Sequence, residues 1–380
     1  MTNKLFKIIA AVGFYGAVCL MASESATAQN LSEKLTTDPK TTTGVLKNGM
    51  KYYIRPNSKP ENKVELRLVI NTGSLMEDDD QQGLAHFTEH MLFNGTKNFP
   101  KNKLVDNLQS MGVQFGADLN AQTGFDETVY MLPIPTDNPK NLETGFQILQ
   151  DWAQGALMTD KDINEERNVV LEEARADLGA SDRLQKKFLP RLLNSRYSER
   201  LPIGKDDLLR SFKPDVLRRF YKDWYRPDLM SVVVVGDITA EKGEALVKKY
   251  FSTLVNPTQS RERIAYGANP YTKQEVMFLT DPEQPSTRLS INFSPRKTEA
   301  DKTVGDYRNT LVEQLAFSAI NRRYRDLASA AVPPFTAAQT SNSSYIRNYQ
   351  ALSVTVLPVS DLTTALNAAV GELVSIQEYG

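Results

Sequence analysis

Alternating and helical hydrophobic spacing divides the first half of the chain into strands and helices. Residues 64–70 alternate apolar and charged side chains, which predicts a strand with one buried face. Residues 45–54 predict a hairpin, because Asn48-Gly49 is a strong signal for a two-residue turn. The other elements predicted here are a helix beginning near Gly83, a loop and strand over 110–132, a helix over 139–156, and a charge-rich helical pattern over 161–187.

The second half of the chain repeats this order of elements. Its pattern predicts strands and helices over 231–235, 239–254, 288–294, 306–327 and 351–357. One internal match is close: Leu132-Pro133 is followed 23 residues later by Gly155, and Leu357-Pro358 is followed 23 residues later by Gly380. The chain is therefore predicted to have an α+β fold of two similar domains, each a mainly antiparallel sheet packed against helices.

The repeat also suggests the domain limits. We expect a polar lead over 29–43, a first domain over 44–225 and a second domain over 226–380. The repeated motif of the second domain ends at the last residue, so this domain has no counterpart of residues 156–190. We therefore expect the second domain to be truncated.

Composition narrows the classes of function. The 380 residues include 45 Lys and Arg against 46 Asp and Glu, which argues against a strongly basic nucleic-acid-binding protein. The hydrophobic content of 41% is enough for a core in each domain. A single Cys excludes a disulfide scaffold and any multi-cysteine metal site. Because the sequence holds two His, a metal site would also need carboxylate ligands.

Residues 1–28 have the pattern of an export signal. Two lysines precede an uncharged, apolar-biased run over 8–22, and Ala26-Thr27-Ala28 has the small-residue spacing of a signal-peptidase site. The run is shorter than the roughly 20 residues of a membrane-spanning helix. Lipid attachment to Cys19 would need a small residue just before the cysteine, and Val18 occupies that position. We therefore expect an exported protein, periplasmic or secreted, with no stable membrane insertion after signal removal.

The most informative segment holds both histidines of the sequence, His86 and His90. On a helix these residues lie one turn apart on one face, so both imidazoles can reach the same ion. Glu89 shares that face and can lie beside the ion without being a ligand, where a general base is needed. His-x-x-Glu-His is the inverted form of a common zinc peptidase motif. The alternative is two ordinary helix histidines with a solvated glutamate between them.

A catalytic zinc needs a third protein ligand, which must be Asp or Glu in this chain. The charge-rich helical segment offers four candidates: Glu165, Glu166, Glu172 and Glu173. Glu166 and Glu173 are seven residues apart, two turns along the same helix face, whereas Glu172 points about 100° away. One of the pair can ligate while the other supports it. The spacing alone does not choose between Glu166 and Glu173. Without the demand for a third metal ligand, this charged run would be interpreted as a solvent-exposed acidic helix face.

From about residue 44 to its end, the sequence resembles the pitrilysin/insulinase family of zinc peptidases, which includes the mitochondrial processing peptidases. The resemblance rests on motifs in the family's order: residues 83–96 with His-x-x-Glu-His, Leu119-Asn120-Ala121-x-Thr123, Thr128-Val129-Tyr130, Glu166-Arg167-x-Val169-Val170-x-x-Glu173, and residues 201–204, 224–228 and 233–237. It implies zinc ligation by His86, His90 and Glu173, with Glu89 as the base that activates water and Glu166 as the supporting acid.

The resemblance also implies a binding mode and a missing part. Substrate peptides are expected to pair as an added strand with an edge strand near 120–130, at residues Asn120, Ala121, Thr128 and Tyr130. Family enzymes close two halves around the peptide, and this chain is at most one half. We therefore expect a second half or a partner subunit to complete the active chamber.

Three functions remain in competition at this point. The first is a zinc endopeptidase acting on peptides or unfolded protein segments. The second is a non-catalytic peptide-binding or scaffold subunit of the same family, or a half-enzyme that is inactive without its partner half. The third is an export-linked metal carrier, which would bind zinc without depending on Glu89.

Overall fold

The structure, a computed structural model, describes residues 30–101, 103–113, 120–176 and 179–379. The predicted export signal over 1–28 lies outside the described residues. The chain forms two compact units. The larger comprises 37–298 and 321–380, and the smaller joins the N-terminal segment up to residue 36 to residues 299–320. In the smaller unit, Lys34 and Thr303 form an isolated β-bridge.

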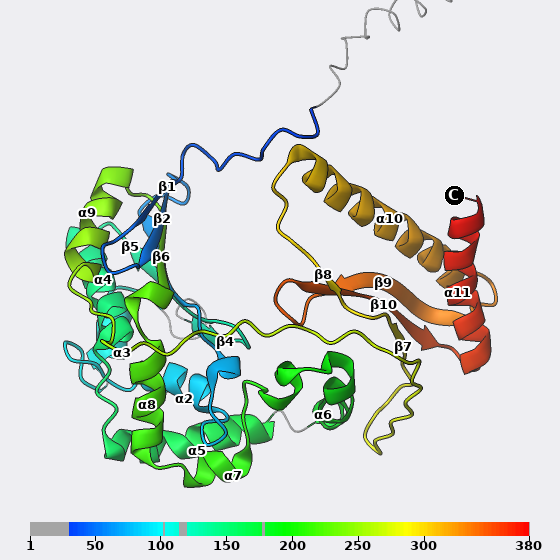
Figure 1. Ribbon diagram of the computed structural model, residues 1–380, viewed down its shortest axis with the longest axis horizontal. Helices are drawn as coiled ribbons and strands as arrows, with labels where there is room; N and C mark the ends of the chain where they lie inside the picture. Colours follow the sequence, from blue (N-terminus) through cyan, green and yellow to red (C-terminus); the bar gives the residue numbers. More distant parts are fainter. Residues whose placement is uncertain (1–29, 102, 114–119, 177–178, 380) are drawn as a thin grey trace, which may run out of the picture. The chain divides into compact units, whose positions relative to one another are not determined.

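A six-stranded sheet forms the centre of the first domain, with strand order β1-β2-β6-β3-β5-β4 (Figure 1). Neighbouring strands are antiparallel except for β2 and β6, which are parallel. The strands are β1 (Thr42–Val45), β2 (Lys51–Pro56), β3 (Lys63–Ile70), β4 (Asn120–Thr123), β5 (Thr128–Pro135) and β6 (Met230–Gly236). Strand β3 alternates buried and more exposed residues along its length, as its sequence pattern predicts.

The predicted hairpin is present, but its turn is longer than two residues. Thr42 pairs with Ile54 and Val45 with Lys51. Beyond them, the Leu46 amide donates to the Met50 carbonyl at 2.8 Å, which leaves three residues in the loop. The last of these, Gly49, has φ +89°, a conformation that glycine adopts without steric cost. The Asn-Gly signal therefore marked the hairpin correctly, while the two-residue turn was wrong, because the glycine closes a three-residue loop.

Helices pack on this sheet, and the predicted charge-rich run is divided in two. Residues 161–176 lie in α5 and residues 180–187 lie in α6, because a new helix begins after Gly179. The helices are α2 (Leu84–Met91), α3 (Lys103–Ser110), α4 (Pro139–Gln154), α5 (Asp160–Ala176), α6 (Ala180–Leu193), α7 (Asp206–Ser211), α8 (Pro214–Trp224) and α9 (Ala240–Phe251), with short 3₁₀ turns η1 (Ser74–Met76), η2 (Arg196–Glu199) and η3 (Pro227–Leu229). Helices α4 and α9 pack on each other and on the sheet.

The first sheet extends past the predicted domain boundary at residue 225. Strand β6 lies between β2 and β3; it pairs with β3 along its whole length and with β2 from Ser231 onward. Its valines at 232 and 234 are fully buried, which explains their buried-strand pattern. Helix α9 packs against β2 and α4. The first sheet and the helices packed on it therefore include β6 and α9.

A second sheet repeats part of the first. Strand β10 (Tyr349–Pro358) pairs antiparallel with β7 (Leu289–Asn292) and β9 (Phe335–Ser343), as β5 pairs with β3 and β4. The short β8 (Arg296–Lys297) also pairs with β10. Leu357-Pro358 ends β10 before α11 (Leu362–Tyr379), just as Leu132-Pro133 lies in β5 before α4. The prediction of two similar α+β domains is confirmed. Helix α10 (Val304–Ala328) is divided between the two compact units.

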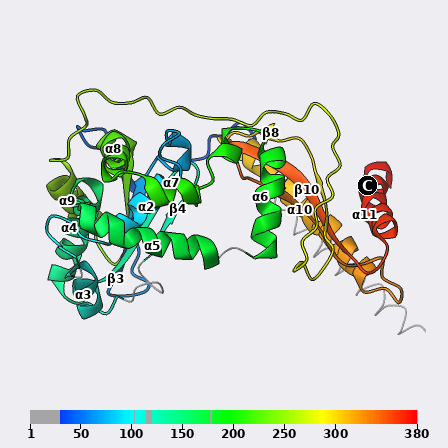
Figure 2. The same ribbon diagram turned by 90° about the horizontal axis from the view of Figure 1, so that it is seen from below.

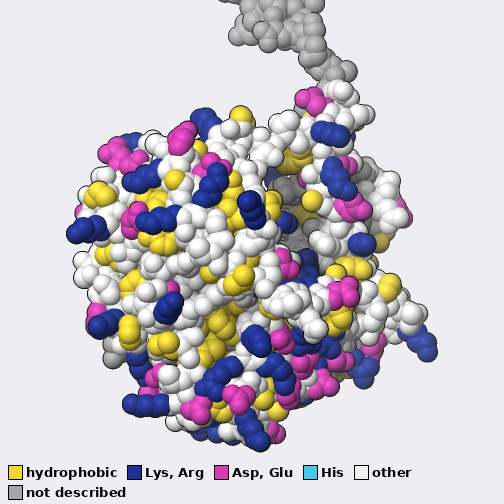
Figure 3. All heavy atoms as spheres, turned by 60° about the vertical axis from the view of Figure 1, so that its left-hand side comes forward, with side chains coloured by type: hydrophobic (Ala, Val, Ile, Leu, Met, Phe, Trp, Pro, Cys, Tyr) yellow, Lys and Arg dark blue, Asp and Glu magenta, His cyan; other side chains and the backbone are white. Residues whose placement is uncertain are grey.

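Charged residues are distributed without large segregation of sign on the face shown in Figure 3. Lys and Arg side chains there alternate with Asp and Glu side chains. Among the described helices, none combines the length and the apolar character needed to cross a bilayer.

Candidate metal centre

Helix α2 carries the His-x-x-Glu-His motif and begins at a close backbone contact. The residue just before the helix, Gly83, is its N-cap, has φ +98° and lies against Gly204. A Cβ added to Gly204 would come within 2.3 Å of the Gly83 Cα. Leu84, Phe87 and Met91 face the core and anchor the helix, which also contacts α5, α8 and β4 (Figure 2). The two histidines therefore occupy the less buried face of a firmly packed helix.

The two histidines of α2 meet one carboxylate of α5. The Nε2 atoms of His86 and His90 are 3.2 Å apart. Glu173 Oε1 lies 3.6 Å from His86 Nε2, and its Oε2 lies 3.2 Å from His90 Nε2. Zinc bonds of about 2.0–2.1 Å in a tetrahedral site separate ligand atoms by about 3.3 Å. The three side chains therefore have the spacing and the donor chemistry of a zinc site, and they form a candidate metal-binding group.

Glu166 contacts the outer side of His90 rather than the space between the imidazoles. Its Oε1 lies 2.9 Å from His90 Nδ1, and its Oε2 accepts a hydrogen bond of 2.5 Å from the Asn94 side chain. A carboxylate bonded to Nδ1 directs the lone pair of Nε2 toward a metal. Of the two glutamates that the helical spacing left open, Glu173 therefore lies where a ligand would lie and Glu166 where a support would lie.

Glu89 lies on the same helix face with a partner from the sheet edge. Its side chain is 8% exposed, and Thr123 Oγ1 at the end of β4 donates a 2.6 Å hydrogen bond to Glu89 Oε2. In the sequence, Thr123 is recognisable only as part of a motif, and its contact with Glu89 was missed. The two partners are 34 residues apart in the sequence, so no local spacing pattern could have revealed the contact.

Burial and neighbouring charges set the ionisation of this group. Burial, with the charge of His90, lowers the pKa of His86 to about 4, so its imidazole is neutral at pH 7, as a metal ligand must be. Burial also raises the pKa of Glu89, although the Thr123 hydrogen bond opposes the shift. Burial disfavours charged His90, but the hydrogen bond and charge of Glu166 outweigh burial and raise the pKa of His90.

The predicted peptide-binding residues fall on two different strands. Asn120 and Ala121 lie on β4, which is the edge strand of the sheet. Thr128 and Tyr130 lie on β5, which is already paired with β3 and β4. Both of these side chains are buried, and the Tyr130 hydroxyl lies 2.6 Å from that of Tyr225. Strand pairing by a peptide at Thr128 and Tyr130, as predicted, is therefore wrong, because an inner strand has no free edge.

Comparison with known protein families matches most of the chain. The model described as "Insulinase (Peptidase family M16)" matches residues 52–202, and the model described as "Peptidase M16 inactive domain" matches residues 211–380. The first match contains His86, Glu89, His90 and Glu173, the residues that meet around α2 and α5.

Individual relatives point to the same family. The chain is 33% identical over 357 residues to "Probable zinc protease PqqL" of Escherichia coli, covering 92% of this chain and 38% of the relative. It is 35% identical over 288 residues to the protein of the same description from Haemophilus influenzae, covering 75% of this chain and 31% of the relative. The chain thus spans about a third of the length of these curated relatives.

A solved structure agrees with the fold. The crystal structure of the first half of the periplasmic protease PqqL from Escherichia coli has a TM-score of 0.84 and 32% identity, covering 91% of this chain and 74% of that chain. The chain belongs to the insulinase family of peptidases. Within that family it is similar to PqqL-like proteins described as probable zinc proteases.

Proposed function

We propose that this chain is the zinc-binding half of an endopeptidase that hydrolyses peptides or unfolded protein segments. The observation that carries the proposal is the meeting of His86, His90 and Glu173 at ligand spacing, with the buried Glu89 on the same helix face. A scaffold subunit needs no such base, and a metal carrier needs no carboxylate held beside the ligands without joining them.

In the proposed mechanism, His86, His90 and Glu173 would hold Zn²⁺, which would supply a Lewis acid and make water a better nucleophile at neutral pH. Glu89 takes the proton from water as the oxygen attacks the scissile carbonyl carbon. The same carboxyl group then delivers this proton to the leaving amine, so that the base is restored at the end of the cycle. Glu166 holds the His90 ring in the orientation that leaves Nε2 free for the ion.

We propose that the substrate backbone pairs with the free edge of β4 beside Asn120 and Ala121. An added strand satisfies the exposed backbone groups of an edge strand, and it selects for extended peptides more than for a particular sequence. The end of this strand holds Thr123, which contacts Glu89. A peptide on β4 would therefore lie next to the proposed base.

The first test of the function measures zinc content and peptide cleavage together. We expect about one zinc per chain, because the three ligands form one group. Quenched peptides are then offered to the chain alone and to the chain mixed with a candidate second half or partner subunit. We expect turnover to depend on the added part. Absence of bound zinc would contradict the proposal and favour the scaffold alternative. Zinc binding without cleavage of any peptide in either mixture would also contradict it and would favour the carrier alternative.

Replacing Thr123 by Val is expected to lower kcat by about 10-fold or more. The substitution keeps the shape of the side chain but removes the hydrogen bond to Glu89, and hydrogen bonds to charged groups contribute about 1.5–3 kcal/mol. Thr123→Ser keeps the hydroxyl and should restore most of kcat. Steady-state kinetics of the active preparation provide the measurement. A change confined to KM, or a Ser variant as impaired as the Val variant, would contradict this role for Thr123.

We also propose that the protein is exported and acts in the periplasm or after secretion. The support is the charged, apolar and small-residue pattern of residues 1–28, together with the similarity to a protease described as periplasmic. Mass spectrometry of exported material is expected to find Gln29 at the N-terminus.

A further inference from the structure

A buried carboxylate caps the helix that carries the metal motif. Glu77 follows η1 and its side chain is fully buried. Its Oε1 accepts hydrogen bonds from the backbone amides of Gly83 at 3.0 Å and Ala85 at 2.8 Å. The first turn of a helix has amide groups without partners inside the helix. Gly83, at the N-cap position, has no side chain to satisfy them, so Glu77 performs this task from six residues upstream.

We propose that Glu77 is a positioning residue of the metal centre, which fixes the start and rotation of α2 so that His86 and His90 face Glu173. This inference rests on the proposed zinc site but adds a residue that does not touch the ion. Helix α2 is eight residues long, and helices of this length are marginal unless they are held by their surroundings. Each residue by which the helix start shifts turns a side chain by about 100°, which would separate the imidazoles from α5.

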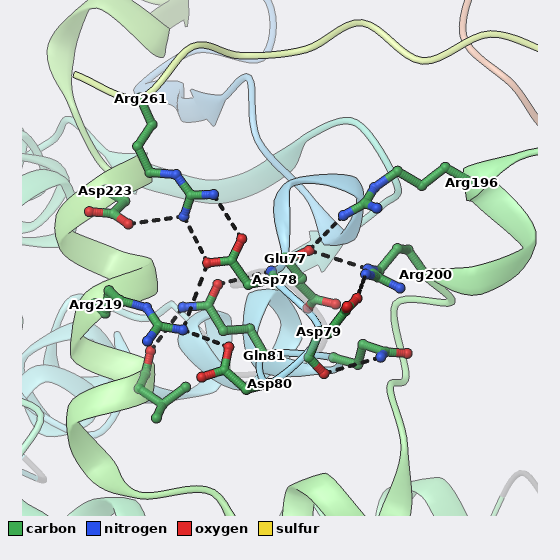
Figure 4. A network of polar contacts seen from close by, with 12 residues as sticks. Glu77, Asp78, Asp79, Asp80, Gln81, Arg196, Arg200, Arg219, Asp223 and Arg261 are labelled. Atoms are coloured by element: carbon green, nitrogen blue, oxygen red, sulfur yellow. Dashed lines mark hydrogen bonds and ion pairs between the residues drawn. The ribbon is translucent and has the colours of Figure 1, made fainter.

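The segment that carries Glu77 is itself held by arginines from distant parts of the larger compact unit (Figure 4). The Glu77 carbonyl accepts hydrogen bonds from Arg196 at 2.8 Å and Arg200 at 3.2 Å. The following three residues are ion-paired: Asp78 with Arg261 at 2.8 Å, Asp79 with Arg200, and Asp80 with Arg219 at 2.6 Å. Both the backbone and the side chain of Glu77 are therefore fixed, and the carboxyl oxygen is presented to α2 from a rigid support.

The chemistry of Glu77 indicates that an acceptor oxygen, rather than a negative charge, is what α2 needs. Burial raises the pKa of Glu77 to about 8, against the lowering effect of the two amide hydrogen bonds. Its second oxygen is buried and has no hydrogen-bond partner. Glutamine has the same length and the same acceptor oxygen. It can therefore replace the neutral acid, whereas leucine fills the space but accepts nothing.

The test compares Glu77→Gln, Glu77→Leu and Glu77→Asp with a matched control, Thr239→Ala. Thr239 caps α9 through its Oγ1, which accepts from the Lys242 amide at 3.2 Å, and α9 carries none of the proposed ligands. Zinc affinity is measured by competition with a chelator, ligand geometry by the visible spectrum of the Co²⁺-substituted protein, and stability by thermal unfolding.

We expect Glu77→Leu to bind zinc about 10–100-fold more weakly, the range known for partners that orient metal ligands, with an altered Co²⁺ spectrum. Glu77→Gln should weaken zinc binding by much less than about 10-fold, because glutamine keeps the acceptor oxygen. Thr239→Ala should lower the unfolding temperature and leave zinc affinity and the Co²⁺ spectrum unchanged. If Glu77→Leu does not fold, Glu77→Asp takes its place. The shorter aspartate side chain cannot reach the α2 amides in the same way, so this variant should bind zinc more weakly than Glu77→Gln.

Two results would overturn the inference. One is parental zinc affinity and an unchanged Co²⁺ spectrum in folded Glu77→Leu, or, if that variant does not fold, in Glu77→Asp. The other is a loss of zinc affinity in Thr239→Ala equal to that of the Glu77 variants. Lower stability of the whole protein would then explain the loss in the Glu77 variants without any positioning role. A parent protein that binds no zinc would instead contradict the proposed function itself, so the two failures are distinguishable.

Discussion

Replacing Glu89 by Gln is expected to lower peptide turnover by at least about 10²–10⁴-fold while zinc content stays near that of the parent. General acid–base groups contribute rate factors of this size. Glutamine keeps the length of the side chain and an oxygen that can accept from the Thr123 hydroxyl, but it cannot take a proton from water. Because the proposed ligands are His86, His90 and Glu173, removing the Glu89 charge should leave the metal in place.

The assay for Glu89→Gln needs a preparation that is active, with the second half or partner subunit present if activity requires it. Zinc content and peptide affinity are measured on the same samples, because the loss is expected in kcat and not in binding. Glu165→Gln is the matched control: it removes a carboxylate from α5 that pairs with Lys101 on the surface. Near-parental cleavage by Glu89→Gln would rule out Glu89 as the general base.

Replacing Glu173 by Gln is expected to weaken zinc binding by more than about 100-fold. Changes to residues that only support a ligand already cost about 10–100-fold, and Glu173 is proposed as a ligand itself. Its two oxygens lie 3.6 and 3.2 Å from the two histidine Nε2 atoms. A neutral amide oxygen is a much poorer zinc ligand than a carboxylate. Metal analysis and chelator competition give the affinity.

The neighbouring residue provides the control for Glu173→Gln. Glu172 is exposed and pairs with Arg175 one turn further along α5, so Glu172→Gln should leave zinc affinity unchanged. Glu166→Gln should give an intermediate loss, because Glu166 bonds to the back of His90. Equal losses from Glu172→Gln and Glu173→Gln, or no loss from either, would refute the ligand assignment.

Local sequence patterns predicted the parts of this fold that depend on neighbouring residues. The alternation over 64–70 predicted β3, and the helical spacing from Gly83 predicted α2. The four-residue spacing of His86 and His90 was enough to predict that the imidazoles meet, because one helical turn fixes their relative position. The repeated Leu-Pro motif was enough to indicate two similar domains.

The same patterns failed where a partner comes from far along the chain. The valine-rich strand near 231–235 was correctly predicted as a buried strand, but its position between β2 and β3 was not predicted. Its pairing between β2 and β3 brings together residues more than 150 positions apart. A continuous apolar run indicates that a strand is buried, and it carries no information about which strands are its neighbours.

By itself, the sequence determined the helix of the His-x-x-Glu-His motif, the shared face of its two histidines and Glu89, and the need for a carboxylate in any metal site, because these follow from helical spacing and from a composition with few histidines and one cysteine. Helical spacing left Glu166 and Glu173 open, and the family resemblance implied Glu173. In the structure Glu173 faces the Nε2 atoms of both histidines, whereas Glu166 contacts Nδ1 of His90, and this difference depends on where α5 meets α2. Only the tertiary structure decided that Thr123 reaches Glu89 and that Glu77 caps α2. Such contacts depend on how elements pack in space, and no local period encodes that packing.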